Sequence, residues 1–548
     1  MLFRSPGMPP QNASSIRLAE PAVGDLPDSA AGYAGVDAVA LRADASLDAL
    51  SEGQQKALED YVAFGGSLIL VAGGQSTGST SGLVHDLAPA DLGPMNRSVA
   101  LAGVGKVAAA SLVLRAGAQT HTLVPGSDGM PIAVSQSYGA GTVAVVAVDL
   151  PSVALQAGDP LAMRRLWRTL IGDGVSQRTT FLGMLSGDNG TSSYYGGRSW
   201  YAYGSGPQVL GAALRRARSL DPPSIDAVGL FLLAYLLVVA PINYLVLKRL
   251  DRKELAWLTI PALVLVFVGG AYAAAYWSKG NGTALVRVAV AETSVGSRVA
   301  GVASATGVFS SGLRSYNFRL PDPSAQITND GRDLAEDTLG SIGQTRIVEG
   351  AGYRMVEHAT IPQWAMRVFD TRSVVDLGGD FEGALNLGPN NTLRGSITNK
   401  TRYALKDCLI YCQGNRRPVG DLRPGQSVSV DEHIAGAVLS EPFDDLYSGE
   451  AYGGMRYGYA AARARAPKGT DEERLKLGIE HAVIAGMNDP YSGRKTMLGR
   501  DDHAYLIGWS SDDDIGGPGL LMDNVAPSHR AVSMIAVAIP LSRGEMRK

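Results

Sequence analysis

The sequence predicts a multidomain protein that combines an α/β domain, a transmembrane α-helical hairpin and an all-β region. Residues 227–247 and 255–278 form two uncharged, strongly apolar runs. Residues 16–176 alternate between strand-like and helix-like patterns, which is typical of a largely parallel sheet. Residues 283–437 contain short strand-like runs separated by turn signals, which favours an antiparallel β-sandwich.

The overall composition is that of an ordinary protein and hides the membrane segments. The chain has 548 residues, a formal net charge of −3 and 18% charged residues. This balance suggests neither a basic surface for nucleic acid nor a polyanionic tail, so we expect no nucleic-acid partner. Hydrophobic residues make up 45% of the chain, which is within the globular range. The apolar runs therefore emerge only when the sequence is read in windows.

The first fifteen residues do not have the pattern of a folded segment. Four proline and glycine residues fall within positions 6–10, and no apolar stretch of signal-peptide length is present. Leu-Phe-Arg-Ser at 2–5 is also what a common sequencing adapter encodes in one frame. We therefore expect residues 1–15 to be a disordered or artefactual start, with the true start and a signal or anchor segment further upstream.

Residues 16–176 carry the α/β pattern. Ser51-Glu52-Gly53-Gln54 has the sequence of a capping box, in which side chains pair with free backbone N–H groups at the start of a helix. Gly65-Gly66 marks the end of that helix. The apolar run at 67–72 suits a buried parallel strand. Further strands are expected at 36–41 and 142–148, and a second helix at 160–171.

Three short motifs give this region a family resemblance: Tyr-x-Gly-Val-Asp-x-Val at 33–39, Leu-Ser-x-x-Gln at 50–54 and Tyr-Val-x-x-Gly-Gly-Ser-Leu at 61–68. The region resembles the class I glutamine-amidotransferase-like domains of bacterial membrane proteins, which implies a flavodoxin-like parallel sheet. Working members of that superfamily use a cysteine nucleophile after a central strand, backed by a histidine. No cysteine precedes Cys408 in this chain. The resemblance therefore implies a retained fold without its chemistry.

Other residues of this region give only weak signals of a site. His85 and His121 are its histidines, and neither lies in a recognisable motif. Gly73-Gly74 could cradle a phosphate with backbone N–H groups, but no Lys-Ser/Thr follows in P-loop spacing. We interpret this pair as a tight turn. The sequence nominates no catalytic residue, no cofactor-binding residue and no cofactor.

The hairpin prediction rests on length and on the edges of the two runs. Ala227–Leu247 holds 21 residues without a charge and Leu255–Ser278 holds 24. At about 1.5 Å per residue, the shorter run forms a helix of roughly 30 Å, which matches the bilayer core. The alternative is a pair of buried helices in a soluble core, which two such runs in succession disfavour. Aromatic residues of the interfacial type lie near the edges: Tyr244, Trp257, Tyr272, Tyr276 and Trp277.

The turn at 248–254 predicts the orientation. Four of its seven residues are basic, and positive charge near membrane ends is retained in the cytoplasm. The turn should then be cytoplasmic and both soluble regions extracytoplasmic. Arg215, Arg216 and Arg218 oppose this assignment, because they lie just before the first helix, but the short turn has the denser charge.

The hairpin is predicted to be an anchor rather than a carrier. Pro241, Asn243 and Pro261 interrupt the runs, which neighbouring helices can compensate in a membrane. Neither run holds a charged residue of the kind that transport sites use. The motif from Tyr235 through Arg252–Pro261 resembles an uncharacterised family of bacterial membrane proteins with the same order of parts. The resemblance implies architecture and brings no established reaction.

The remaining segments complete the expected domain order. Residues 177–224 form a linker, 438–490 a partly helical insertion and 491–548 strands that complete the C-terminal domain. Within 283–437, Pro424-Gly425 before a final strand resembles immunoglobulin-like folds of bacterial envelope proteins.

Two groups of residues leave alternatives open. Cys408 and Cys412 are interpreted as core or surface residues, with a redox pair as the alternative; they exclude a disulfide-stapled scaffold and a four-cysteine zinc site. The acidic runs Asp501-Asp502-His503 and Ser511–Asp514 are interpreted as solvated loops, with calcium as the alternative. No EF-hand spacing is present, so we nominate no metal ligand.

These observations favour a non-catalytic integral protein of the bacterial cell envelope, with the lipid bilayer and envelope proteins as partners. An accessory subunit of an exporter or surface machine is one alternative. An extracytoplasmic hydrolase is another, with its centre in the Gly- and Ser-rich stretch Ser186–Gly197, which includes Asp188, Ser192 and Ser193. No Gly-x-Ser-x-Gly elbow supports that alternative.

Overall fold

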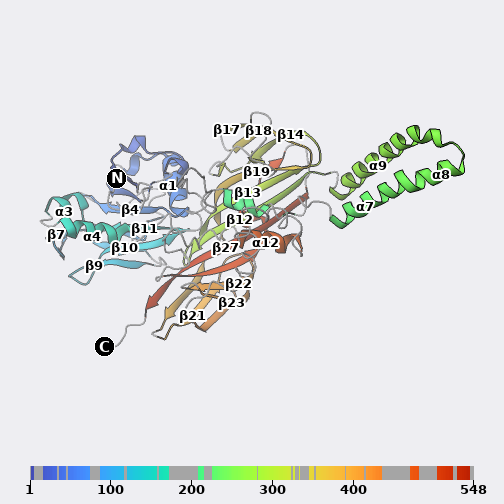
Figure 1. Ribbon diagram of the computed structural model, residues 1–548. Coiled ribbons are helices and arrows are strands. Elements are labelled where there is room, and N and C mark those ends of the chain that lie inside the picture. The colour runs from blue at the N-terminus through green and yellow to red at the C-terminus, as the bar shows by residue number, and fades with distance from the viewer. Residues whose placement is uncertain are drawn as a thin grey trace, which may run out of the picture.

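The computed structural model shows a strand-rich chain with mixed sheets and two apolar helices that form a hairpin (Figure 1). The structure describes residues 2–4, 17–33, 36, 38–44, 47–73, 87–115, 120–156, 160–171, 208–214, 217, 225–279, 282–322, 325–327, 332–333, 345–350, 353–388, 390–412, 415–434, 470–480, 503–522 and 528–543.

The N-terminal α/β unit is built on a seven-stranded sheet in the described part of the chain, in the order β2-β1-β3-β4-β11-β10-β9. β3, β4 and β11 are parallel, whereas every other neighbouring pair is antiparallel. The strands are β1 (Leu2–Arg4), β2 (Arg17–Ala19), β3 (Ala38–Ala43), β4 (Ser67–Ala72), β9 (His121–Pro125), β10 (Pro131–Tyr138) and β11 (Gly141–Val146).

Two expectations for this unit require correction. The sheet is mixed rather than largely parallel, because only Gly139 and Ala140 link β10 to β11, and a parallel pair needs a much longer crossover. Residues 2–4 form a strand instead of belonging to a disordered start. These residues pair with β3. Without them, β3 would be the edge strand and its outer backbone N–H and C=O groups would be unpaired.

Helix α1 (Glu52–Ala63) packs beside the central strands, and its start follows the predicted capping box. Ser51 accepts a hydrogen bond from the Gln54 backbone, and the Gln54 side chain accepts one from the Ser51 backbone. Gly65 has φ 105°, which a glycine adopts at low cost just past a helix end. The unit also contains η2 (Val23–Asp25), η3 (Ala30–Tyr33), η4 (Leu47–Ala49), α3 (Leu150–Gln156), α4 (Pro160–Ile171), β5 (Ala90–Leu92), β6 (Arg97–Leu101), β7 (Gly105–Ala109) and β8 (Leu112–Leu114).

The second unit, the β-rich body, is organised around the long C-terminal strand β27 (Ser528–Arg543). β27 pairs in parallel with β12 and β20 and antiparallel with β25, so the last strand of the chain lies inside the sheet (Figure 1). The other strands of this sheet are β12 (Ala284–Ser294), β13 (Val299–Ser310), β15 (Gln326–Ile327), β16 (Arg332–Asp333), β19 (Ala365–Asp376), β20 (Phe381–Leu387), β21 (Thr392–Asn399), β22 (Leu405–Cys412), β23 (Asn415–Leu422), β24 (Ser427–His433) and β25 (His503–Ser510).

Two short helices cover one face of the body, and both lie outside the strand-rich segments of the sequence. α6 (Gln208–Leu214) falls in the expected linker 177–224, yet it packs on β12 and β13 because Leu210 and Leu214 are buried there. α12 (Asp471–Glu480) falls in the expected helical insertion and packs on α6 and β27. A smaller sheet lies at the end of the body near the hairpin: β14 (Arg314–Leu320), β17 (Arg346–Gly350), β18 (Tyr353–Ile361) and β26 (Leu521–Met522).

The α/β unit and the body are in direct contact. Phe64, just past α1, is buried in the same apolar cluster as residues of the body sheet, and the Arg372 guanidinium lies 6.0 Å from its ring centroid. The Gly139 backbone donates a hydrogen bond of 2.8 Å to Ser297 Oγ. These contacts join the chain before the hairpin to the chain after it.

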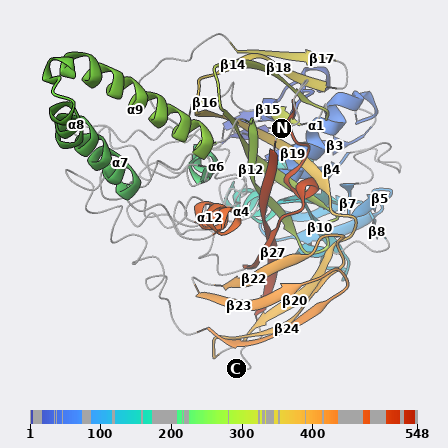
Figure 2. The same ribbon diagram turned by 90° about the vertical axis from the view of Figure 1, so that its right-hand side faces the viewer.

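The hairpin projects from the opposite end of the body from the α/β unit (Figures 1 and 2). Its first arm is α7 (Ile225–Leu237), the π-helical segment η7 (Val238–Ile242) and α8 (Asn243–Arg249). Its second arm is α9 (Ala256–Lys279), preceded by the 3-10 turn η8 (Lys253–Leu255). Each arm is long enough to cross a membrane, by length and composition.

Candidate functional site

The hairpin is the strongest candidate for a functional surface, because its apolar side chains are not covered by protein. Only 6% of the apolar window of the first arm and 0% of that of the second are buried. Large side chains such as Leu230, Trp257 and Leu265 are 69%, 75% and 72% exposed. Soluble proteins rarely leave so continuous an apolar surface in water. Of the two interpretations of these runs, buried core helices do not fit this arrangement.

Aromatic side chains hold the two arms together. The Phe267 ring of α9 lies 5.5 Å from that of Phe231 and 5.3 Å from that of Tyr235, both in edge-on geometry. Such pairs add to the apolar contact between helices. Asn243 is 9% exposed, although most of its neighbours in sequence are open. Its polar side chain therefore faces the interior of the hairpin rather than the surroundings.

The prolines are accommodated in different ways in the two arms. Pro241 lies inside η7, where the wider π-helical turn makes room for its ring and for the missing N–H donor. Pro261 is the sixth residue of α9, so its ring removes the hydrogen bond to the carbonyl four residues earlier, and the helix continues past it. Neither proline ends its arm.

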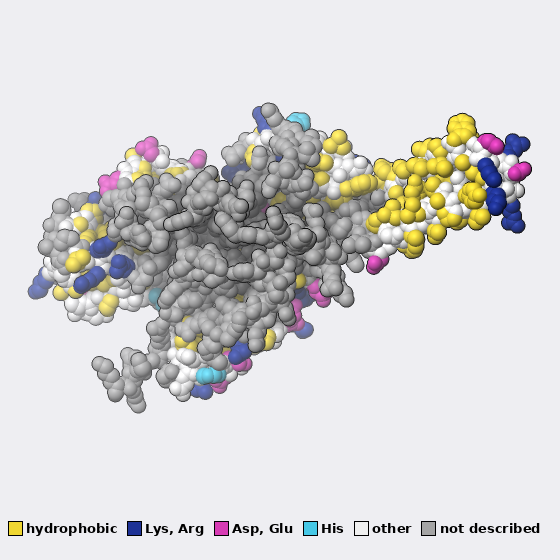
Figure 3. Space-filling view, viewed as in Figure 1, with side chains coloured by type: hydrophobic (Ala, Val, Ile, Leu, Met, Phe, Trp, Pro, Cys, Tyr) yellow, Lys and Arg dark blue, Asp and Glu magenta, His cyan; other side chains and the backbone are white. Residues whose placement is uncertain are grey.

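The far end of the hairpin is charged and its sides are apolar (Figure 3). Lys248, Arg249, Arg252 and Lys253 gather at this end with two acidic residues, and all of them are exposed. A charged turn at the end of an apolar hairpin matches a bilayer, in which charges belong in the headgroup region and apolar side chains in the core.

The carboxyl ends of β3, β4 and β11 form a second candidate, because ligands of α/β sheets often bind there. Arg42 Nη2 lies 3.3 Å from Asp149 Oδ2, and Ser152 Oγ donates to the same oxygen at 2.6 Å. A side chain at Gly73 would meet Asp44 Cβ at 3.3 Å, so there is little room for one beside this end of β4. The sequence reading missed this ion pair, although Asp149 directly follows an apolar run. His121 lies on β9, and His85 and Gly74 lie outside the described residues.

The acidic loop after β25 contacts basic side chains of the body. Asp513 Oδ2 lies 2.7 Å from His529 Nδ1, and Asp513 Oδ1 lies 3.7 Å from Arg287 Nη2. Within the described ranges, no three His, Cys, Asp or Glu side chains are grouped so that they could share a metal ion. Asp501 and Asp502 lie outside those ranges. The loop therefore has a visible structural role.

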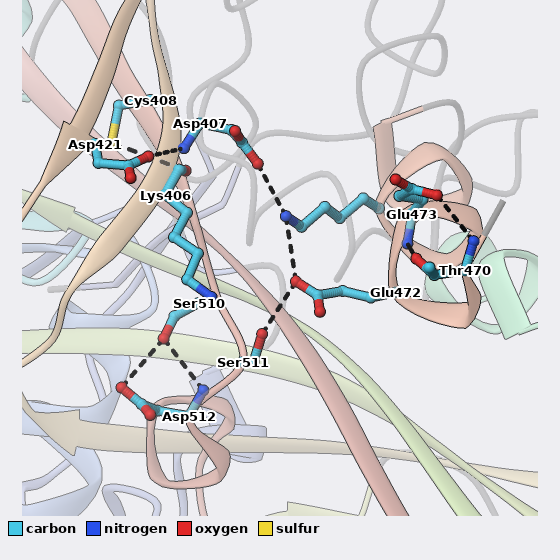
Figure 4. Close-up of polar contacts among 11 residues, drawn as sticks. Lys406, Asp407, Cys408, Asp421, Thr470, Glu472, Glu473, Ser510, Ser511 and Asp512 are labelled. Carbon is cyan, nitrogen blue, oxygen red and sulfur yellow. Dashed lines mark hydrogen bonds and ion pairs between the residues drawn. The ribbon is translucent and has the colours of Figure 1, made fainter.

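A polar cluster connects α12 to the body (Figure 4). Lys476 Nζ lies 3.0 Å from Asp407 Oδ2 on β22 and 3.3 Å from Glu472 Oε1. Ser511 Oγ donates to Glu472 at 3.1 Å. Every member of this cluster has a partner within it, so its geometry explains helix docking rather than chemistry.

The two cysteines are buried and free on β22. Burial raises the pKa of the Cys408 thiol to about 12 and that of the Cys412 thiol to about 11. A thiol with a raised pKa is a poor nucleophile at neutral pH. This environment fits core residues better than a redox pair. The Ser186–Gly197 stretch, with Asp188, Ser192 and Ser193, lies outside the described residues, as do Arg215, Arg216 and Arg218.

Comparisons with known proteins add a family match in the body. Residues 380–542 match the model of a family described as "Domain of unknown function (DUF8725)". That span runs from β20 into β27 and excludes the hairpin and the α/β unit. A search of curated proteins finds no match.

Among solved structures, the yeast delta-COP-I mu-homology domain complexed with a Dsl1 WxWxV peptide is 7% identical, with a TM-score of 0.25 over 48% of this chain and 98% of that one. The Fcho1 Mu homology domain of Danio rerio with a bound Eps15 peptide is 6% identical, with a TM-score of 0.21 over 48% and 97%. Likeness at this level carries no argument about fold or function.

Proposed function

We propose that this chain is a non-catalytic integral membrane protein whose hairpin anchors the α/β unit and the β-rich body on one side of a membrane. The observation that carries the proposal is the hairpin itself, which extends away from the body with 6% and 0% of its two apolar windows buried. Insertion into a bilayer removes this surface from water, at roughly 25 cal/mol for each Å² of apolar area.

The packing around the hairpin supports placing both soluble units on the same side. α6 precedes the first arm, and it packs on β12 and β13, which follow the second arm. Leu214 of α6 and Val288 of β12 belong to the same buried cluster. A membrane cannot pass between elements that share a core. The shared core therefore supports a chain that enters and leaves the bilayer at the same face.

The orientation is proposed from charge. Basic residues near membrane ends are retained in the cytoplasm, so the turn at 248–254 is assigned to the cytoplasm and the two units to its outside. The setting that follows from the resemblance is the bacterial cell envelope, with a catalytically degenerate amidotransferase-like α/β unit and an immunoglobulin-like body. The three parallel strands β3, β4 and β11 are compatible with that descent.

The absence of a catalytic role is proposed from the sequence and from the ion pair at the carboxyl ends of the parallel strands. No cysteine precedes Cys408, and Arg42 and Asp149 pair with one another at the carboxyl ends of the parallel strands. We infer that the soluble units present surfaces to protein partners in the envelope.

Extraction of membranes with alkaline carbonate tests the anchor. Leu232 and Val266 are 53% and 67% exposed on the two arms, and each arginine placed there costs about 2.5–3.5 kcal/mol in a bilayer. The L232R/V266R variant should shift from the carbonate-resistant membrane fraction to the supernatant. The matched control is V113R, at a residue 61% exposed on β8, which should stay in the membrane. An unmodified protein that is monodisperse in buffer without detergent would refute the proposal.

A further inference from the structure

The base of the hairpin meets the body through an aromatic contact. The Trp364 ring, in the turn between β18 and β19, lies 6.0 Å from the Tyr272 ring of α9. Trp364 has φ 57°, a conformation that bulky side chains rarely adopt. Its indole Nε1 is buried and has no hydrogen-bond partner among the described residues. Both the left-handed backbone and the unpaired indole N–H are unfavourable for a tryptophan at this position. The ring contact with Tyr272 of α9 offsets part of this unfavourable free energy.

The contact also fixes the depth of this turn. Tyr272 lies within the apolar span Lys253–Ala274, seven positions before the end of α9 at Lys279. Seven positions correspond to about 10 Å along a helix. The body therefore reaches past the end of α9 to the level of its membrane-spanning part. Four residues separate Lys279 from Ala284, which is five steps along the chain, so β12 starts within roughly 18 Å of the helix end.

A second turn lies beside the first. The Trp364 backbone donates a hydrogen bond of 2.8 Å to the Ser310 carbonyl, where β13 ends and the turn to β14 begins. Leu313 in that turn is 68% exposed, and Arg314 next to it is also exposed. Figure 3 shows hydrophobic side chains on the end of the body from which the hairpin projects. An exposed leucine beside an arginine suits a lipid interface, where the apolar group enters and the cation stays with the phosphates.

We propose that residues 311–314 and 362–364, the two membrane-facing turns, rest in the headgroup region of the bilayer that the hairpin crosses. The partner of this surface is a phospholipid surface. The exposed Leu313 reaches its apolar edge, while the partly buried Trp364 joins its turn to α9. The inference rests on the proposed membrane anchor and adds that the body is seated on the membrane rather than held above it. Two contacts carry it: the Trp364 ring lies against Tyr272 of α9, and the Trp364 backbone is hydrogen-bonded to Ser310 beside the second turn.

Fluorescence quenching by labelled lipids tests this seating. The full-length protein with Leu313→Cys carries an environment-sensitive dye at that position and is placed in nanodiscs with a phosphatidylcholine whose acyl chain bears a shallow nitroxide. The expected result is a loss of fluorescence relative to nanodiscs without nitroxide, with blue-shifted emission. V113C is the matched control in the α/β unit and should keep its fluorescence. The native cysteines are buried, and unmodified protein treated with the dye gives the background.

A label in the hairpin separates the two claims. Leu245→Cys, at a residue 60% exposed on α8, should be quenched if the hairpin lies in the bilayer. Quenching at 245 with none at 313 would overturn the seating and leave the anchor intact. No quenching at either position would overturn both.

Discussion

Arg287 is a cation in the interior of the body. It is the fourth residue of β12 and is 2% exposed. Its guanidinium donates to the Gly517 carbonyl at 2.8 Å and to the Asp513 carbonyl, and the Asp513 carboxylate lies nearby. Burial lowers the pKa of Arg287, and the carboxylates of the loop counteract that effect. One side chain thus holds the loop after β25 against the sheet.

Removing this cation should destabilise the body. R287A leaves the buried Gly517 carbonyl and the partly buried Asp513 carbonyl without this donor, so we expect a loss of about 1–3 kcal/mol in the free energy of unfolding. Thermal unfolding in detergent, followed by circular dichroism, measures the change. The control is R394A, because Arg394 and Asp431 form an exposed pair at 2.9 Å, and such pairs contribute little. Equal losses in the two variants would contradict the role of Arg287.

Asp60 predicts a pH dependence. Burial raises its pKa from 3.8 to about 6; Lys56 at 3.1 Å lowers it, while Glu59 and Asp322 raise it. The folded state therefore binds this proton more tightly than the unfolded chain does. The stabilisation from protonation is complete below about pH 4, falls as the pH rises to about 6, and is absent above that.

The D60N variant should remove the fall in stability between about pH 4 and pH 6. Its neutral amide should also raise the unfolding temperature at pH 7. A shift of about two pKa units sets an upper limit of about 3 kcal/mol on the gain. Unfolding midpoints measured between pH 4 and 7 test it, with the exposed Glu20 changed to Gln as a control. A fall in stability that persists in D60N would show that another group causes it.

At the scale of elements, α12 is held by burial more than by charge. Leu475 and Ile479 are 1% and 0% exposed against the sheet. The ion pair of Lys476 with Asp407 lies at the surface, where the Asp407 side chain is 70% exposed. Apolar burial should therefore dominate the docking of this helix.

Two variants of α12 separate the contributions. I479A should cost about 2–5 kcal/mol, because it opens a cavity in the core. K476A should cost about 1 kcal/mol or less, as exposed ion pairs do. Hydrogen exchange of 471–480 measures each effect locally. The reverse order of the two losses would contradict this account of the docking.

The sequence predicts some elements well and others poorly for identifiable reasons. The capping box at Ser51 is local, so four residues suffice to place the start of α1. The two arms are long uncharged runs, and their ends fall within a few residues of those predicted. α6 has only seven residues, too few for a clear period, and it is helical because the sheet buries one of its faces. The antiparallel pairing of β10 with β11 could not be predicted, because the two-residue link at Gly139-Ala140 has the same sequence pattern as other glycine turns.

At the scale of the molecule, long-range pairing limits what the sequence predicts. β27 lies between β12 and β25, and residues 528–538 of it pair with a strand more than two hundred positions earlier. The contacts of Arg287 and Trp364 likewise join distant segments. No local pattern marks such residues, whereas the two apolar runs, on which the proposed bilayer partner rests, can be read directly from the sequence.

The most direct measurement is protease accessibility in spheroplasts of a bacterial host, using full-length protein with a different epitope tag at each end and a cysteine at Asp251 in the turn. Elements on both sides of the hairpin share one core, so the protease should remove both tags. The positive charge of the turn predicts a cytoplasmic location, so Asp251→Cys should be protected from an impermeant thiol reagent. Removal of both tags with protection of the turn would support the anchored, single-sided arrangement. Removal of one tag with protection of the other would contradict it.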